Sequence, residues 1–200
     1  IVLGANDVEN TGRIDGRKVT IKASQDVINT GNIHGEKQVN INVGRDINVG
    51  AHVNRLQHHD IVGRQGTIGV GEKGDLVLSA KRDVNLKGAI VYTGDNSKAT
   101  IEAGQNINLT TEALSAKKDM TVNSENYNRT DRRTELGTAI LSDSNVNLHA
   151  GNDVNIRNGI VNSEHGVTSV EAGNDVTITN GQSYSRDESV SYTHLTLPTT

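Results

Sequence analysis

One ten-residue phrase of alternating apolar and polar positions recurs along the chain, most clearly as SVEAGNDVTI at 169–178 and NLHAGNDVNI at 147–156. Apolar residues at every second position predict two short β-strands, one on either side of a Gly-x-Asp corner. Each copy is anchored on an acidic or amide residue at that corner: Asp7, Asp26, Asp46, Asp83, Asn106, Asp119, Asp153 and Asp175. Most anchors are about 20 residues apart, and we interpret the interval of 37 between the third and fourth as two turns with a degenerate copy between them.

When the repeat copies are aligned on their anchors, equivalent positions indicate which residues are expected to face a core. The residue after the anchor is apolar in every copy: Val8, Val27, Ile47, Val84, Ile107, Met120, Val154 and Val176. The residue five positions before the anchor is also apolar: Val2, Ile21, Ile41, Leu78, Ile101, Leu114, Leu148 and Val170. The residue three positions before it is mostly small: Gly4, Ala23, Val43, Ala80, Ala103, Ala116, Ala150 and Ala172.

A strand of about five residues cannot bury its apolar face alone, so we expect the repeats to stack as coils about 4.8 Å apart. A second motif closes each coil with a Gly-containing turn and an inward β-branched residue, at Ile14, Ile33, Ile90 and Ile160. The sequence therefore predicts an all-β fold, a parallel β-helix or β-solenoid of about 20 residues per coil. About eight or nine coils would make a rod about 40 Å long.

The anchor column raises an electrostatic question, because carboxylates stacked about 4.8 Å apart repel one another. The residue before each anchor is always cationic or amide: Asn6, Gln25, Arg45, Arg82, Gln105, Lys118, Asn152 and Asn174. We expect the acids to cap turn amides while these neighbours offset the repulsion. The column is thus interpreted as a source of stability rather than of catalysis.

Two segments interrupt the repeat. Residues 54–74 are expected to form an irregular coil, and residues 123–144, which are rich in charge, a loop or hairpin projecting from the stack. From Ser189 the chain reads SVSYTHLTLPTT, which resembles a translated transposon adapter, so 189–200 are expected to be a non-native tail. We assign 1–188 to one β-helical domain. Its opening IVLGANDV has neither Met nor a signal peptide, so we expect it to be the interior of a longer protein.

Composition agrees with short strands and narrows the function. The chain has 21 Val, 16 Ile, 21 Gly and 23 Asn, which favour strands and tight turns. With no Cys, it has no disulfides, thiolate metal sites or cysteine nucleophile. A net charge of −4 and 2% aromatic residues give neither a basic field nor a stacking platform for nucleic acid. No apolar run approaches the roughly 18 residues of a membrane span.

Several local motifs are interpreted as structural. His58 and His59 are adjacent and would point apart on a strand, whereas zinc requires converging ligands. The tripeptide at 73–75 resembles integrin-binding sequences but is explained by a turn before the strand at 75–79. Asn108 and Asn128 begin glycosylation sequons in a chain rich in Asn. Gly-x-Asp motifs about 20 residues apart bring too few oxygens together for calcium. We expect no catalytic, cofactor-binding or metal-binding residues.

The segment AGNDVNIRNGIVNSEHGVTSVEAGNDVTITNGQSYSRDES at 150–189 resembles the haemagglutinin repeats of filamentous haemagglutinin and of contact-dependent growth inhibition toxins. NTGRIDG at 10–16 and NTGNIHG at 29–35 resemble the second repeat class of this family, so the resemblance covers about 1–188. It implies a right-handed β-helical shaft on the surface of a Gram-negative bacterium. It also implies two-partner (type V) secretion, in which another region engages an outer-membrane transporter.

On this resemblance we expect a structural shaft segment of a secreted adhesin or inhibition toxin. It would extend a distal region towards a receptor or glycan on a host or neighbouring cell, without cofactor or enzymatic activity. Two alternatives stay open. Polysaccharide lyases and hydrolases also use parallel β-helices, and their candidate residues here are Asp131, Arg132, Arg133 and Glu135, although these lie in one local run. The segment 123–144 could instead bind a glycan or receptor.

Overall fold

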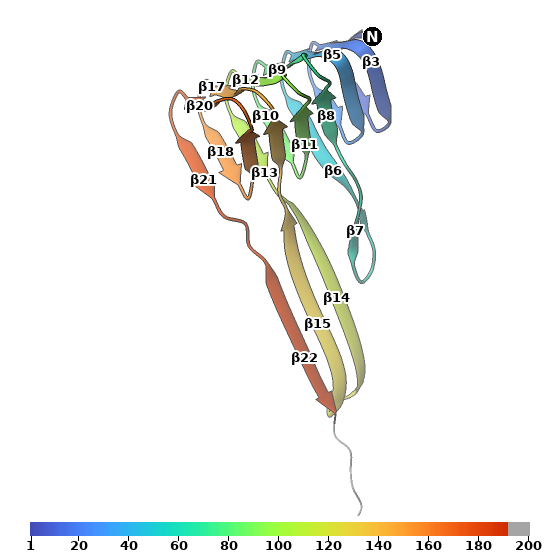
Figure 1. Cartoon of the computed structure of the whole chain (residues 1–200). Coiled ribbons are helices and arrows are strands. Elements are labelled where there is room, and N and C mark those ends of the chain that lie inside the picture. Colours follow the sequence, from blue (N-terminus) through green and yellow to red (C-terminus); the bar gives the residue numbers. More distant parts are fainter. Residues whose placement is uncertain (192–200) are drawn as a thin grey trace, which may run out of the picture.

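The computed structural model describes residues 1–191, and within them the chain forms β-strands joined by turns, with no helix. Successive coils stack along one direction, and a narrow antiparallel sheet projects to one side (Figure 1). Each full coil contributes one strand to each of three faces, which we name the first, second and third face in chain order. The predicted all-β architecture is confirmed, its strands are mostly parallel, and the stacking is consistent with a β-solenoid.

The first face is a ladder of parallel strands in which every strand is hydrogen-bonded to its equivalents in the adjacent coils. In order along the ladder, its strands are β1 (Val2–Ala5), β3 (Arg13–Ala23), β5 (Asn32–Val43), β9 (Asp75–Ala80), β12 (Lys98–Ala103), β17 (Val146–Ala150) and β20 (Thr168–Ala172).

The third face begins with the amino-terminal parts of β3 and β5, which bend from the third face onto the first. In the later coils a loop separates the two faces, and each face has its own strand. These third-face strands are β8 (Thr67–Val70), β11 (Ile90–Thr93), β16 (Ala139–Ser142) and β19 (Ile160–Ser163).

The second face carries the residues that follow the anchors. Val84 pairs with Ile47 on one side and Ile107 on the other, and Val154 pairs with Ile107 and Val176. Within residues 1–191 this ladder holds seven strands, so the expected eight or nine coils are not confirmed. The strands are β2 (Val8–Asn10), β4 (Val27–Asn29), β6 (Ile47–Arg55), β10 (Val84–Lys87), β13 (Ile107–Thr110), β18 (Val154–Arg157) and β21 (Val176–Thr179).

A continuous core of Val, Ile, Leu and Ala fills the space between the three faces. On the second face, Val27, Ile47, Val84, Ile107 and Val154 have no solvent-exposed surface. Because each strand buries only alternate residues, the apolar side chains of neighbouring coils complete one another's packing. The core therefore depends on register from coil to coil and not on any coil by itself.

The first coil departs from the predicted columns by one residue. Leu3 pairs with Ile21 and Ala5 with Ala23, so Leu3 and Ala5 take the inward positions expected for Val2 and Gly4. The cause is a shorter corner, because one residue separates the inward Ala from the anchor in this coil and two do so in the next. A shift of one residue moves a side chain to the opposite face of a strand.

The same shift affects the third face. Ile33 is buried as predicted, but in two later coils Val91 and Val161 face the core instead of Ile90 and Ile160. Ile160 is 59% exposed. Each of these coils has two adjacent β-branched residues after its turn, and strand alternation places the second of them inside.

The long interval between the third and fourth anchors is one coil and not two. Val84 pairs directly with Ile47, so no coil separates them. The additional residues form a hairpin, in which the end of β6 pairs antiparallel with β7 (Asp60–Gln65). The segment 54–74 is therefore not an irregular coil throughout, because it continues from the hairpin into β8, where Ile68 is fully buried.

The expected repeat copy at 113–122 is wrong for the same reason. Ile107 pairs directly with Val154 across adjacent coils, and residues 113–122 lie on the arm of a second hairpin. Asp119 therefore anchors no corner of the solenoid, and Met120, which was expected in the core column, is 59% exposed.

This second hairpin and the last described strand form a three-stranded antiparallel sheet, which we name the lateral sheet (Figure 1). Its strands are β14 (Glu112–Asn123), β15 (Asn126–Leu136) and β22 (Tyr184–Ser191), in that order across the sheet. The expected tail at 189–200 begins inside β22, and its residues 192–200 lie outside the described residues.

All three departures from the stack start at the same edge of the solenoid. The chain leaves the second face partway along β6, and again after β13 and β21. It returns to the third face at β8 and β16. Each hairpin therefore occupies the turn between the second and third faces, where it adds residues without adding a coil.

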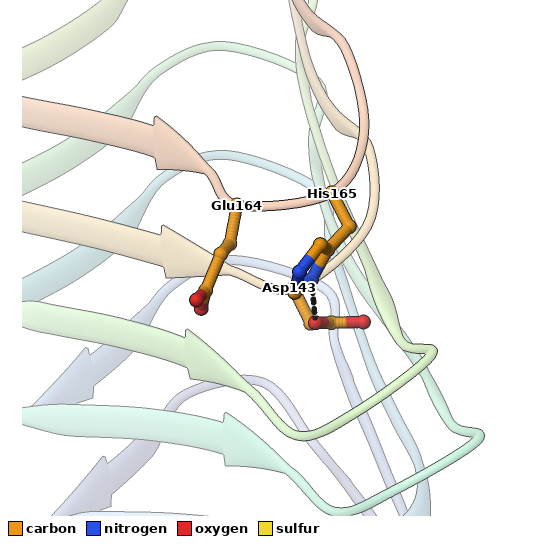
Figure 2. Close-up of side chains that lie close together, drawn as sticks. All are labelled: Asp143, Glu164 and His165. Atoms are coloured by element: carbon orange, nitrogen blue, oxygen red, sulfur yellow. Dashed lines mark hydrogen bonds and ion pairs between the residues drawn. The ribbon is translucent and has the colours of Figure 1, made fainter.

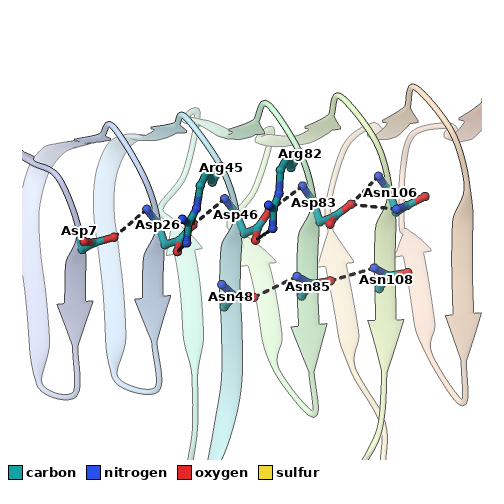
Figure 3. A network of polar contacts seen from close by, with 10 residues as sticks. All are labelled: Asp7, Asp26, Arg45, Asp46, Asn48, Arg82, Asp83, Asn85, Asn106 and Asn108. Atoms are coloured by element: carbon teal, nitrogen blue, oxygen red, sulfur yellow. Dashed lines mark hydrogen bonds and ion pairs between the residues drawn. The ribbon is translucent and has the colours of Figure 1, made fainter.

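The anchor residues form a continuous polar column along one corner of the solenoid (Figure 3). A side-chain oxygen of each anchor accepts the backbone N–H of the next anchor, at 2.9–3.3 Å. Arg45 also donates to Asp26, and Arg82 donates to Asp46 at 3.0 and 2.6 Å. The prediction that anchors cap turn amides is confirmed, and Arg45 and Arg82 are the neighbours seen to place a positive charge beside the preceding acid. The hydrogen bond from Arg45 is the main cause that lowers the pKa of Asp26.

Candidate functional site

The lateral sheet exposes two polar faces, because most of its side chains lie outside the core. On one face, charges of opposite sign alternate across the three strands in two consecutive rows. Lys117 Nζ lies 3.8 Å from Asp131, Arg129 lies 3.3 Å from Asp119, and Arg186 contacts Glu188. Cross-strand pairs of opposite charge stabilise a sheet modestly. The rows are Lys117–Asp131–Arg186 and Asp119–Arg129–Glu188.

A cleft of about 690 Å³ lies where the lateral sheet meets the solenoid. It is bounded by β14 and β15, by the β6–β7 hairpin, and by residues of β18 and of the segment that leads into β22. Its charged lining includes both signs: Arg55, Asp60, Asp131, Arg133, Glu135 and Arg157. A cleft of this size with converging polar groups can hold a small ligand or one end of a polymer.

The β6–β7 hairpin supports one side of this cleft. Asp60, whose side chain is only 5% exposed, accepts the backbone N–H and the hydroxyl of Ser115 at 2.8 and 2.9 Å. The N–H bond is the main cause that lowers the pKa of Asp60. Arg55 lies 2.7 Å from Asp60 and also contacts Glu112, which Lys87 approaches to 2.8 Å. These bonds fix the hairpin against β14.

Glu135 fixes the other side. Arg157 of β18 donates two hydrogen bonds to its carboxylate at 2.8 and 3.2 Å, and the backbone N–H of Gln182 donates a third at 3.2 Å. The hydrogen bond from Arg157 is the main cause that lowers the pKa of Glu135. This carboxylate therefore joins the solenoid, β15 and the segment leading into β22.

The structure brings three of the four candidate residues for polysaccharide chemistry to this cleft. Asp131, Arg133 and Glu135 line it, whereas Arg132 lies on the opposite face of β15 and contacts Asp187 at 3.3 Å. The carboxylate of Glu135 is held by Arg157, so its observed contacts are those of a structural ion pair. Glycoside hydrolysis generally uses two carboxyl groups that flank the glycosidic bond. Asp131 and Glu135 do not form such a pair, because the carboxylate of Glu135 is already bound by Arg157.

The other singled-out motifs are spread over the surface. His58 and His59 form the tip of the β6–β7 hairpin, where the backbone of each contacts β14. Residues 73–75 form a turn into β9, as predicted. The side chain of Asn108 donates to Asn85 at 2.8 Å (Figure 3), and Asn155 donates to Asn108 at 3.0 Å, so the three form a ladder.

Sequence reasoning missed Arg55 and Arg157, the two arginines that hold the ends of the cleft. Arg55 lies in the hairpin part of β6 and Arg157 lies on β18 in a separate coil, and no local motif marks either of them. The cleft itself was also missed, because it depends on two hairpins that leave the solenoid at the same edge.

Replacement of Glu135 by Gln is expected to loosen the lateral sheet while the core stays intact. The change removes the charge that holds Arg157, so amide hydrogen exchange in β15 and β22 should accelerate at least about tenfold. In the wild type the same loosening should appear in acid. The folded pKa of Glu135 lies below its ordinary 4.5, so its contribution is present above pH 4.5 and is lost as the pH falls through the lower folded value.

Glu125→Gln, in the exposed turn at the far end of the hairpin, is the matched control and should leave exchange near the cleft unchanged. Equal exchange rates in the Glu135 variant and the wild type would contradict the role assigned to this ion pair.

The fold and the site together define a class of protein, a parallel β-solenoid of repeated coils that carries a lateral antiparallel sheet with a charged cleft at its base. Residues 119–195 match the family model described as hemagglutinin repeat. This match is consistent with a repeat of the filamentous haemagglutinin type in this part of the chain. Comparison with curated proteins and with solved structures yields no match.

The family match agrees with the resemblance at 150–189. Proteins of this repeat family are generally structural or adhesive rather than enzymatic, and they are typically secreted or displayed at the cell surface. The repeat also suggests a two-partner secretion context. Within residues 1–191 no helix is long and apolar enough to cross a membrane.

Proposed function

We propose that this chain is a shaft segment of a secreted, cell-surface filamentous adhesin or contact-dependent inhibition toxin. In this proposal the shaft is a right-handed β-helix that extends a distal binding or toxin region away from the cell. An outer-membrane transporter, engaged by another region of the protein, exports the chain. Residues 1–188 serve as one β-helical domain, and the residues from 189 onward are not part of it.

The observation that carries the proposal is the unbroken ladder of the second face. Val84, Ile107, Val154 and Val176 pair in register across consecutive coils, although a 25-residue excursion (112–136) separates two of them. Backbone hydrogen bonds run along the axis of the stack, which makes such a rod stiff. Because each added coil is templated by the one before it, the chain can fold progressively outside the cell without ATP.

Duplication of one coil tests the shaft role. The 20 residues 27–46 contain β4, all of β5 and one corner. No strand pairing joins them to the antiparallel part of either hairpin. A second copy placed after Asp46 should lengthen the particle by about 4.8 Å in small-angle scattering and keep a single cooperative melting transition. A scrambled insert of the same composition is the matched control and should lower the melting midpoint.

An unchanged length, or equal destabilisation by both inserts, would argue against a modular shaft. Surface location is tested separately with an antibody against residues 1–188. It should label intact cells of the producing bacterium, and labelling only after permeabilisation would contradict the proposed location.

The cleft favours a second candidate function, which is local binding of a glycan or receptor on the lateral sheet. Arg133 lines the cleft, and a glycan array probed with the wild type and with Arg133→Ala would test this role. Binding that is lost in this variant but kept in Arg17→Ala, a surface change far along the stack, would support it. Release of unsaturated sugars from pectin-like polymers would instead support the enzymatic alternative.

A further inference from the structure

A second polar corner lies between the third and first faces, and we name it the acidic corner. Each of five successive coils places an acid there: Glu36, Glu72, Asp95, Asp143 and Glu164. In the first two coils a lysine follows the acid, and Lys37 donates to the backbone oxygen of Glu72 at 2.8 Å. In the next three the following residues are Asn96, Ser144 and His165. The cationic partner thus changes along the stack from lysine to a single histidine.

At the last of these corners, Asp143, Glu164 and His165 converge from two adjacent coils (Figure 2). His165 Nδ1 lies 2.7 Å from Asp143 Oδ1, and the backbone N–H of Asn96 donates to Asp143 Oδ2 at 2.6 Å. One potential ligand atom from each of the three side chains lies within 4.8 Å of the others. The side chain of Asp143 is largely buried at 17% exposure, whereas that of His165 is 70% exposed.

The charge of this cluster is not balanced by lysine or arginine. Within residues 1–191, His165 is the only basic side chain that forms an ion pair with Asp143 or Glu164. Asp95 lines the same hollow of about 420 Å³ as Asp143, Glu164 and His165. Three acids around one imidazole create a negative site that favours a multivalent cation.

We propose that this cluster binds a divalent transition-metal ion of the zinc type, with His165, Asp143 and Glu164 as protein ligands and water in the remaining position. One imidazole and two carboxylates suit zinc, whereas calcium binds through oxygen alone. Ligand atoms of a tetrahedral zinc site are about 3.4 Å apart. The ligand atoms of this cluster all lie within 4.8 Å of one another. Binding would replace the 2.7 Å contact between His165 and Asp143 by two bonds to the metal.

The ion would join adjacent coils at their corner. Asp143 follows β16, while Glu164 and His165 follow β19, so the bonds to the metal run along the axis of the stack. This inference departs from the sequence-based expectation of no metal site. Residues 143 and 165 are about one coil apart, and only the solenoid brings them together.

The test is calorimetric titration of the purified, chelator-treated chain with zinc chloride. The wild type should bind one zinc ion per chain. In His165→Gln the affinity for zinc should fall at least about tenfold. Glu164→Gln should also weaken binding, and it leaves the buried bonds of Asp143 untouched. Zinc should raise the melting midpoint of the wild type but not of His165→Gln, and calcium should not compete.

His149→Gln is the matched control. His149 also faces a carboxylate of the adjacent coil, Glu171, at 3.5 Å, but that pair is not part of any three-ligand cluster found in the described residues. Its zinc affinity and its zinc-dependent midpoint should equal those of the wild type. Equal zinc binding by His165→Gln and the wild type would overturn the proposal, as would no binding at millimolar zinc.

Discussion

Val154→Asp is expected to lower the free energy of unfolding by at least about 3 kcal/mol, because it places a carboxylate in the core where nothing can pair with it. Val154 has no exposed surface and lies between Ile107 and Val176 in the ladder of the second face. A buried charge there disturbs three consecutive coils and not one. A denaturant titration followed by circular dichroism measures the effect.

Asp131→Ala is the control for that experiment. Asp131 lies on the lateral sheet, is half-exposed, and approaches Lys117 only to 3.8 Å. Such a surface ion pair contributes little, so the change should cost about 0.5 kcal/mol or less. If the two substitutions cost the same, Val154 would not lie in the core of a stacked solenoid.

Gly151→Ala is expected to destabilise the stack by about 2 kcal/mol, because the new methyl group would collide with the backbone of the preceding coil. A Cβ at Gly151 would lie 2.2 Å from the carbonyl oxygen of Gly104, and the equivalent Gly173 has the same conflict with Gly151. The glycine of the Ala-Gly-x-Asp motif is therefore explained by close stacking of corners.

Gly50→Ala is the matched control, because the nearest atom to a Cβ there is 3.7 Å away. This change should be nearly neutral or slightly stabilising. Lys81 occupies the corner position equivalent to these glycines. The hydrogen bond from its backbone N–H to the carbonyl of Val43 is 3.2 Å long, whereas the bond from Gly151 N–H to the carbonyl of Ala103 is 2.9 Å, so the corner with a side chain is stacked less closely. A thermal midpoint for Gly151→Ala equal to that of the wild type would show that the corners can separate without cost.

The sequence predicted the stack well because its core columns obey a physical constraint. A residue such as Val84 must be apolar if it faces the interior, and it must recur once per coil if coils stack in register. The same reasoning identified the anchors and their neighbours, since a column of acids such as Asp26 and Asp46 needs donors close by. The structure shows these donors as turn amides and as Arg45 and Arg82.

The insertions could not be predicted in the same way. A hairpin inserted at one turn adds residues without adding a coil. From the spacing of the anchors alone, such an insertion was interpreted as an additional coil. The polar, alternating strand at 113–122 imitated a repeat copy, because a solvated strand has the same period as a buried one. The cleft depends on Arg55 and Arg157, which only the finished stack brings near the lateral sheet.

Within the described part of the chain, every excursion emerges from the turn between the second and third faces. The appendages are therefore aligned on a single side of the rod, and the coil that bears each one sets its position along the rod. Elongating such an appendage moves its tip outwards and leaves the rest of the column undisturbed. The sequence of an appendage can consequently change with little effect on the stability of the stacked core. For engineering, the turn between the second and third faces offers insertion sites for foreign peptides, spaced by whole numbers of coils.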